Sequence, residues 1–258
     1  MALTVLISNQ KGGVGKTTTA VNLATALAAI KKKVLLIDLD PQSNATTGFG
    51  IYSTKNGSTY DLMIQSRNLS EIIINTSIPG LTLAPSNINL IGAEIELVQA
   101  DNREKILKNA LLQYKNKYDY IIIDSPPSMG ILTLNGLTVA DGIIIPLQCE
   151  YYAMEGLNYL LNSVRRVKNS FNHNLRIFGI LLTMFDKRNA LSLSIAKDVR
   201  ETMGKQVFNT VIPRNTKISE APSYGKPVLI YDVKCAGSCA YMELAREFLE
   251  RQQSWQTN

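Results

Sequence analysis

The chain has 258 residues, of which 45% are hydrophobic and 19% charged, so it can bury one sizeable core and is neither fibrous nor intrinsically disordered. Its 27 lysines and arginines outnumber its 21 acidic residues by six, a mildly basic balance that favours a polyanionic partner without identifying one. Its apolar runs are too short to span a bilayer, and Met1 leads into a strand-like run with no room for a cleavable signal. We therefore expect a soluble protein of the cytoplasm.

Short β-branched runs alternate with helix-length segments along the whole chain. Strands are expected at residues 3–8, 34–38, 120–124, 142–147, 177–183 and 207–212, and helices at 16–29, 93–114, 155–169, 190–203 and 238–252. The strand runs are apolar throughout, as in strands buried on both faces of a sheet, whereas residues 44–89 read as loops and short elements. This pattern predicts one α/β domain over residues 1–258, with a mostly parallel central sheet and helices on both faces.

A glycine-rich stretch lies between the first expected strand and the first expected helix. It reads Lys11, Gly12, Gly13, Val14, Gly15, Lys16, Thr17, Thr18. The glycines let the backbone curl so that its N–H groups face phosphate oxygens, and the helix adds its positive end. In such a loop Lys16 reaches the β- and γ-phosphates and Thr17 offers its hydroxyl to Mg²⁺. The strand–loop–helix context argues against a chance glycine turn, so we predict a P-loop NTPase that binds ATP and Mg²⁺.

Two further strands end in carboxylates that complete this site. Asp38 and Asp40 lie two apart at the end of the second strand and point the same way, towards the phosphate side of an open parallel sheet. Alone, such a pair is also typical of a solvated turn. The apolar run that ends at Asp124 has the Walker B arrangement, in which the carboxylate holds Mg²⁺. Together with the loop, these residues predict a hydrolytic phosphate site.

The loop departs from the simple GxxxxGK[ST] pattern, because Gln10 stands where the first glycine would be and Lys11 follows it. Lys11 is poorly placed for its own phosphates but could reach those held by a facing subunit. The stretch resembles the deviant Walker A motif of the ParA/MinD ATPases, which dimerise face to face around two ATP molecules. The segments DLDPQSNATTGFG, YDYIIIDSPPS, LLTMFDKRN and VIPRNTKISEAPSYGKPV extend the resemblance over nearly the whole chain. They are similar to the ParA/Soj chromosome- and plasmid-partitioning ATPases.

This resemblance implies roles for individual residues. Asp40 orients the attacking water, Asp38 supports the Mg²⁺ region together with Thr17 and Asp124, and Lys11 acts with Lys16 in catalysis. It also implies an ATP-dependent homodimer that binds double-stranded DNA non-specifically and is released when a ParB-type partner stimulates hydrolysis. Since no arginine finger lies near these motifs, we expect slow intrinsic turnover. The expected location is the nucleoid, with no membrane partner.

Basic residues of the C-terminal half are the candidates for contact with DNA. We favour Lys187, Arg188, Arg214 and Lys217 for this role. Such residues neutralise backbone phosphates without reading the base sequence, although a solvated face is the alternative for any single lysine. Arg214 has a competing role, because Pro213, Arg214 and Asn215 follow a strand end and could border the adenine.

Other classes of protein remain to be weighed against this interpretation. A MinD-like membrane switch needs a C-terminal amphipathic helix, but Glu243, Glu247 and Glu250 oppose binding to anionic lipid, and the apolar stripe of that helix is predicted to pack on the core. An iron–sulfur protein like the nitrogenase iron protein would need cysteines at a spacing that Cys235 and Cys239 do not match. A degenerate scaffold conflicts with the complete set of phosphate-site residues.

Overall fold

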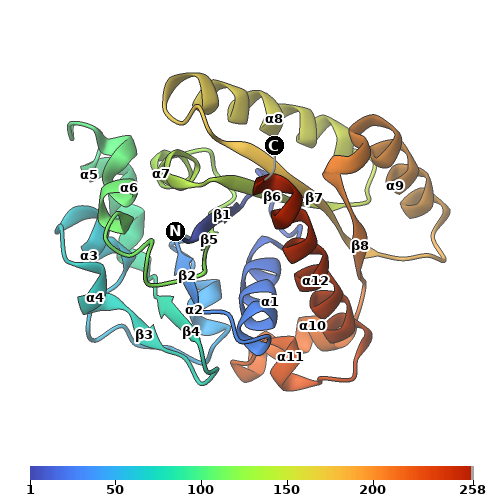
Figure 1. The fold of residues 1–258 in the computed structure, drawn as a ribbon, viewed down its shortest axis with the longest axis horizontal. Helices are drawn as coiled ribbons and strands as arrows, with labels where there is room; N and C mark the ends of the chain where they lie inside the picture. The colour runs from blue at the N-terminus through green and yellow to red at the C-terminus, as the bar shows by residue number, and fades with distance from the viewer. Residues whose placement is uncertain (257–258) are drawn as a thin grey trace.

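The central feature of the fold is one eight-stranded sheet with the order β3-β4-β2-β5-β1-β6-β7-β8 (Figure 1). The computed structural model describes residues 1–256. The strands are β1 (Leu3–Ile7), β2 (Val34–Asp38), β3 (Ile74–Asn75), β4 (Leu81–Ala84), β5 (Tyr120–Asp124), β6 (Gly142–Gln148), β7 (Arg176–Phe185) and β8 (Val207–Pro213). All neighbouring pairs are parallel except β3–β4.

Helices cover both faces of this sheet, and each face has its own apolar cluster. The longer helices are α1 (Lys16–Ala29), α7 (Ile131–Val139), α8 (Ala153–Ser170), α9 (Ala190–Met203) and α12 (Ala236–Gln256). The shorter ones are α2 (Asn44–Thr47), α3 (Thr59–Ile64), α4 (Leu69–Ile72), α5 (Ala93–Glu96), α6 (Ile106–Leu111), α10 (Thr216–Glu220) and α11 (Val228–Tyr231), with single 3₁₀ turns η1 (Ile88–Gly92), η2 (Arg103–Lys105), η3 (Gly204–Gln206) and η4 (Ala221–Tyr224). Buried residues of α1 and α12 pack on one face, and those of α7, α8 and α9 on the other. No helix within residues 1–256 is long and apolar enough to cross a membrane.

The register of the central strands brings the predicted carboxylates together. Asp38 at the end of β2 and Ile7 at the end of β1 both pair with Asp124 at the end of β5. Because the strands are parallel, their carboxyl ends share one edge of the sheet, where the loop after β1 also begins. The predicted α/β fold with helices on both faces is therefore confirmed.

The six predicted strands are all present, but one prediction about the middle of the chain needs correction. The single helix expected at 93–114 is wrong: α5 ends at Glu96, and Asn102, with a backbone φ of 52°, takes the left-handed conformation before η2 and α6 begin. Residues 44–89 form loops and short elements as expected, and two of these elements, β3 and β4, join the sheet. That residues 1–258 form a single domain stays a prediction, and residues 257–258 lie outside the described part.

The cluster between α12 and the sheet gives a test of the fold. Phe248 is fully buried, with its ring 4.6 Å from Phe178 and 5.4 Å, edge to face, from Tyr120 between centroids. Phe248→Ala should lower the free energy of unfolding by roughly 3–5 kcal/mol, because it leaves a cavity as well as removing apolar contacts. Urea unfolding followed by circular dichroism measures this loss. Leu112→Ala, at a side chain that is 63% exposed, is the control and should change stability by less than about 0.5 kcal/mol; equal losses would contradict this packing.

Candidate nucleotide site

The glycine-rich loop between β1 and α1 is held from both sides before any ligand binds. Asn9 accepts a hydrogen bond from the Lys11 N–H (3.0 Å) and donates one to the carbonyl of Pro146 in β6 (2.7 Å). From β7, the Thr183 hydroxyl donates to the carbonyl of Val14 (2.8 Å). The two neighbouring strands therefore fix the loop at both ends, and Asn9 and Thr183 are two functional positions that the sequence patterns did not single out.

Glycine is required at two positions of this loop. Gly13 and Gly15 have backbone φ angles of 75° and 88°, in the left-handed region that side chains disfavour. No heavy atom lies within 4 Å of a Cβ placed at Gly12 or Gly13, so the space inside the curl stays open. Helix α1 then begins at Lys16, which directs its free N–H groups and positive end at this space.

Lys16 places a buried ammonium group at the mouth of the loop. Its Nζ donates to the carbonyl of Lys11 (2.9 Å), across the loop itself, and the residue is only 7% exposed. Burial lowers the pKa of Lys16, while the charges of Asp124 and Asp40 act in the opposite direction. The ammonium is therefore incompletely compensated, as expected of a group that has an anionic ligand to bind.

Asp124 is the most unusual group of the site. It is fully buried, and neither carboxyl oxygen finds a hydrogen-bond partner among the described residues. Burial raises the pKa of Asp124 well above its usual range, and Asp38 adds to the increase. The Thr17 hydroxyl partly opposes this, although it does not reach hydrogen-bond geometry. Two orphaned carboxyl oxygens beside a threonine hydroxyl suit a hard cation, so the residues present fit Mg²⁺.

The chain alone does not supply a full set of metal ligands. Within the described residues, no group of three or more histidine, cysteine, aspartate or glutamate side chains could hold a metal ion. Mg²⁺ usually takes one or two protein oxygens and completes its shell with phosphate and water. A metal at Asp124 and Thr17 would therefore arrive together with a nucleotide.

Asp38 has a different environment, although it is as deeply buried. Its Oδ2 accepts hydrogen bonds from the N–H (2.9 Å) and the hydroxyl (2.7 Å) of Thr46, and its Oδ1 accepts one from the Asp40 N–H (3.1 Å). Burial raises the pKa of Asp38 to about 6. With both oxygens engaged, Asp38 fixes the turn that carries Asp40, and its predicted part in the metal region is best described as positioning.

Asp40 lies nearer the opening of the site. It is 6% exposed, its Oδ1 caps the Gln42 N–H (2.9 Å), and its charge acts on both Lys16 and Asp124. The second carboxyl oxygen accepts no hydrogen bond within the described residues. Asp40 therefore combines a fixed position beside the phosphate loop with a free acceptor, which is the arrangement that orienting a water requires.

A cavity of about 260 Å³ opens beside the loop at the ends of β7 and β8. Pro213, Arg214 and Asn215 line it, together with Thr18 and Gly15 of the phosphate loop, and their predicted place beside the adenine stays a prediction. Sequence reasoning missed further lining residues, which are Met184, Ile212, Ile218, Pro222 and Tyr241. Met184 has a backbone φ of 49°, a strained conformation of the kind that gathers at binding sites but leaves no mark in the sequence. A base bound here would have its phosphates on the loop.

Lys11 is held by an ion pair outside the curl of the loop. Its Nζ forms an ion pair with Glu150, just after β6, and both side chains are nearly half exposed. An exposed ion pair of this kind is worth less than about 1 kcal/mol, so Lys11 can leave it for a stronger partner at little cost. The predicted contact of Lys11 with a facing subunit stays a prediction.

The predicted DNA-contacting residues lie at the same edge of the sheet. Lys187 and Arg188 follow β7 and are exposed, and Lys217 follows β8. Arg188 is paired with Asp186 through two hydrogen bonds (3.0 and 2.9 Å), and Lys217 with Glu220 (2.8 Å). The structure thus gathers these cations on adjacent strand ends, and Arg214, which lines the cavity, lies between them in sequence.

Comparison with known proteins agrees with this description. The family model described as an AAA domain matches residues 2–177. The chain is 51% identical to the chromosome partitioning protein ParA of Caulobacter vibrioides, over 97% of this chain and 95% of the relative. It is 50% identical to the sporulation initiation inhibitor protein Soj of Bacillus subtilis, over 96% and 98%.

Solved structures share the fold over nearly the full length. A cobyrinic acid a,c-diamide synthase from Mycobacterium smegmatis, with bound ATP analogue and magnesium, has a TM-score of 0.86 at 36% identity and covers 98% of this chain and 97% of its own. A putative plasmid partition protein from Borrelia burgdorferi, bound to AMPPNP, has a TM-score of 0.81 at 29% identity, covering 98% and 99%. The MinD cell division ATPase of Pyrococcus furiosus, at 23% identity, shares the fold (TM-score 0.80, 97% and 99% covered).

Fold, loop and acidic strand ends define a P-loop NTPase fold with the deviant Walker A loop. The chain belongs to the ParA/Soj family of partitioning ATPases.

Asp124 yields a prediction about pH. Because its pKa in the folded state is raised above the unfolded value, the carboxyl stabilises the fold only while protonated, and that stability is lost as the pH rises through the folded-state pKa. Asp124→Asn stays neutral, so the nucleotide-free variant should unfold at a higher temperature than the wild type at pH 7, and the difference in unfolding temperature should be smaller at pH 4.

Thermal melts at pH 4 to 8 without nucleotide measure this difference. The exposed Asp101→Asn serves as the control and should show no such pH trend. If the difference in stability between Asp124→Asn and the wild type does not change with pH, folding does not raise the pKa of Asp124, and the prediction is wrong.

Proposed function

We propose that the chain is an MgATP-dependent partitioning ATPase that dimerises on ATP, binds DNA non-specifically and is released on hydrolysis stimulated by a ParB-type partner. The observation that carries the proposal is a pair of buried, incompletely satisfied ionisable groups, Lys16 and Asp124, at a phosphate loop. A nucleoside triphosphate with Mg²⁺ supplies the counter-charge to both groups. The names of the relatives and the nucleotides bound to similar structures support the same ligand and role.

The chain's own residues divide the work of phosphoryl transfer. The loop N–H groups and Lys16 bind the β- and γ-phosphates, while Thr17 and Asp124 hold Mg²⁺, which neutralises phosphate charge when bound. Asp38 fixes the turn so that Asp40 faces the attacking water. Lys11, released from Glu150, reaches the phosphates of a second copy, which makes the site complete only in the dimer. Positioning and charge neutralisation are most of what this reaction needs.

A membrane switch of the MinD type is disfavoured by the C-terminal helix. Tyr241, Leu244 and Phe248 of α12 are at most 1% exposed and pack on the sheet. The apolar stripe that would enter a bilayer is therefore used by the core, as the sequence predicted. The proposed location is the nucleoid, through DNA.

Asp40→Ala should separate nucleotide binding from turnover. Removing the carboxylate that orients the water should lower the rate of ATP hydrolysis about 100-fold or more, with ATP affinity changed only a few-fold. Phosphate release and a fluorescent ATP analogue measure the two quantities, and the exposed Asp101→Ala is the control. Turnover within a few-fold of the wild type would remove Asp40 from this role.

DNA binding tests the partner side of the proposal. The wild type should retain random-sequence DNA with ATP and release it with ADP, and affinity should fall steeply with salt. Arg188→Glu/Lys217→Glu should weaken this binding on the order of tenfold without changing ATP affinity, because both cations lie at the carboxyl edge.

Lys197→Glu/Arg246→Glu is the matched control for that variant. Both are exposed cations in ion pairs with a nearby glutamate, away from the ends of β7 and β8. Equal losses of DNA affinity in the two variants would mean that the edge of the sheet at the carboxyl ends of the strands is not the contact surface. A DNA affinity that is the same with ATP and with ADP would reject the proposed control of DNA binding by the nucleotide.

A further inference from the structure

A large hollow lies at the edge of the sheet opposite to the nucleotide site. Strand β7 begins at Arg176, but its pairing with β8 begins only at Ile180, opposite Val207. Residues 176–179 therefore extend beyond the edge strand and leave a gap of about 1,160 Å³, walled by α8, by the end of α9 with η3, and by the last turns of α12. We call this hollow the basic notch.

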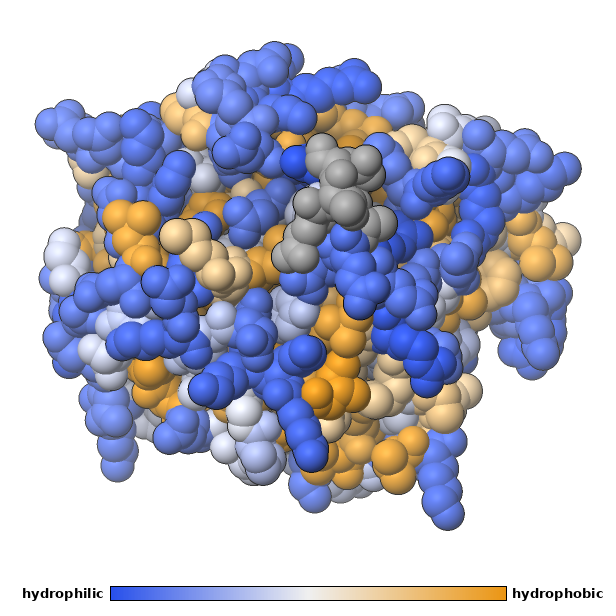
Figure 2. All heavy atoms as spheres, in the orientation of Figure 1, coloured by the Kyte–Doolittle hydropathy of each residue, from blue (hydrophilic) through white to orange (hydrophobic). Residues whose placement is uncertain are grey.

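Six basic side chains line the notch. They are Arg165 and Lys168 of α8, Arg176 of β7, Arg200 of α9, Lys205 of η3 and Arg251 of α12. Only two acidic side chains, Glu247 and Glu250, face them. Figure 2 shows that hydrophilic side chains cover most of this face of the molecule, with apolar side chains in smaller patches between them.

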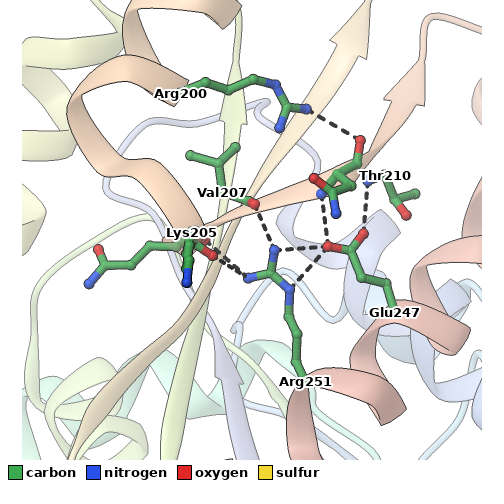
Figure 3. Close-up of polar contacts among 8 residues, drawn as sticks. Arg200, Lys205, Val207, Thr210, Glu247 and Arg251 are labelled. Atoms are coloured by element: carbon green, nitrogen blue, oxygen red, sulfur yellow. Dashed lines mark hydrogen bonds and ion pairs between the residues drawn. The ribbon is translucent and has the colours of Figure 1, made fainter. Parts of the chain in front are cut away.

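One of these cations is part of the framework of the notch. Arg251 donates to the carbonyls of Lys205 (3.2 Å) and Val207 (2.6 Å) and pairs with Glu247 (2.8 Å), whose carboxylate accepts the N–H groups of Asn209 and Thr210 (2.8 Å each) (Figure 3). The pair ties α12 to the backbone at the start of β8. These contacts hold one wall of the notch in place, and its buried acid, Glu247, is already paired with Arg251.

The other five cations lack carboxylate partners. Within residues 1–256, no ion pair involves any of Arg165, Lys168, Arg176, Arg200 and Lys205. Arg176 lies over the ring of Trp255, and Arg200 makes one long hydrogen bond (3.3 Å) to the carbonyl of Asn209. Four of the five are exposed. Unpaired, mostly exposed positive charge around one open hollow is a surface for a polyanion.

The notch is separate from the nucleotide site. Ten residues of β7 lie between them, roughly 30 Å at about 3.3 Å per residue. The predicted contacts Arg188 and Lys217 lie at the carboxyl edge, whereas the notch lies at the amino ends of β7 and β8. If two copies face each other through their phosphate loops, both notches remain on the outer ends.

We infer that the basic notch binds the phosphodiester backbone of double-stranded DNA as a second contact surface, an inference that rests on the proposed function. Guanidinium groups match phosphate oxygens through paired N–H donors, and three of the five unpaired cations are arginines. The apolar residues of the hollow are buried or half-buried: Val164, Phe178 and Val207 are at most 5% exposed, and Ile177, Met203 and Trp255 are half-buried. Its exposed side chains are mainly the cations of the rim, and such a charged surface fits a nucleic acid backbone.

The test reverses two charges on the rim of the notch. Arg165→Glu/Lys168→Glu changes two exposed residues of α8, and Arg166→Glu/Lys108→Glu makes the same charge change at exposed positions outside the notch. Both are compared with the wild type in binding random-sequence duplex DNA with ATP at several salt concentrations. Melting temperature and ATP hydrolysis without DNA should match in all three proteins.

The notch variant should lose DNA affinity on the order of tenfold or more, and its log–log salt slope should become shallower by about 1–2, since each lost phosphate contact removes about 0.9. The control variant should lose much less of either. If the DNA affinity and the salt slope of the notch variant equal those of the control variant, the inference is wrong. It is also wrong if the notch variant binds DNA as the wild type does but no longer binds anionic vesicles. A wild type that binds no DNA with ATP would instead reject the proposed function and the inference with it.

Discussion

The structure depends on an ionisable group that the fold buries without a hydrogen-bond partner among the described residues. Asp124 ends the central strand β5 with two orphaned oxygens, beside the lowered-pKa ammonium of Lys16. A protein keeps such an arrangement only where a ligand completes it, because an unpaired buried charge costs several kcal/mol. The rest of the sheet is organised around holding these two groups in place: Asn9 and Thr183 tie the loop to β6 and β7, and Asp38 fixes the turn after β2.

The proposed function links nucleotide binding to DNA binding, and two strand ends offer a physical route for this link. The cavity beside the loop is lined by residues at the ends of β7 and β8, and Arg188 and Lys217 follow these same two strands. In the proposal, a ligand that orders the ends of β7 and β8 would act directly on cations that are held in weak, exposed ion pairs with Asp186 and Glu220. The basic notch sits at the other ends of these strands, so one pair of strands connects the nucleotide to both charged surfaces.

Sequence reasoning located the phosphate loop, the three aspartates and the six longer strands, because each has a strong local pattern: glycines before a lysine, or apolar runs that end in a carboxylate. It failed where tertiary context decides. The helix expected at 93–114 breaks at Asn102, and two-residue β3 exists only because β4 pairs with it. Asn9, Thr183 and Met184 act through contacts across 137 or more positions or through backbone strain, which no local pattern records. The notch likewise gathers cations from five separate elements.

Calorimetric titration of MgATP into the wild type and into Lys16→Ala tests the central claim most directly. If the buried charges of Lys16 and Asp124 are completed by MgATP, the wild type binds it tightly, removal of Mg²⁺ weakens binding, and Lys16→Ala shows no measurable heat although it folds. Lys31→Ala, an exposed lysine after α1, should bind as the wild type does. Tight binding of MgATP by the Lys16→Ala protein would contradict the account.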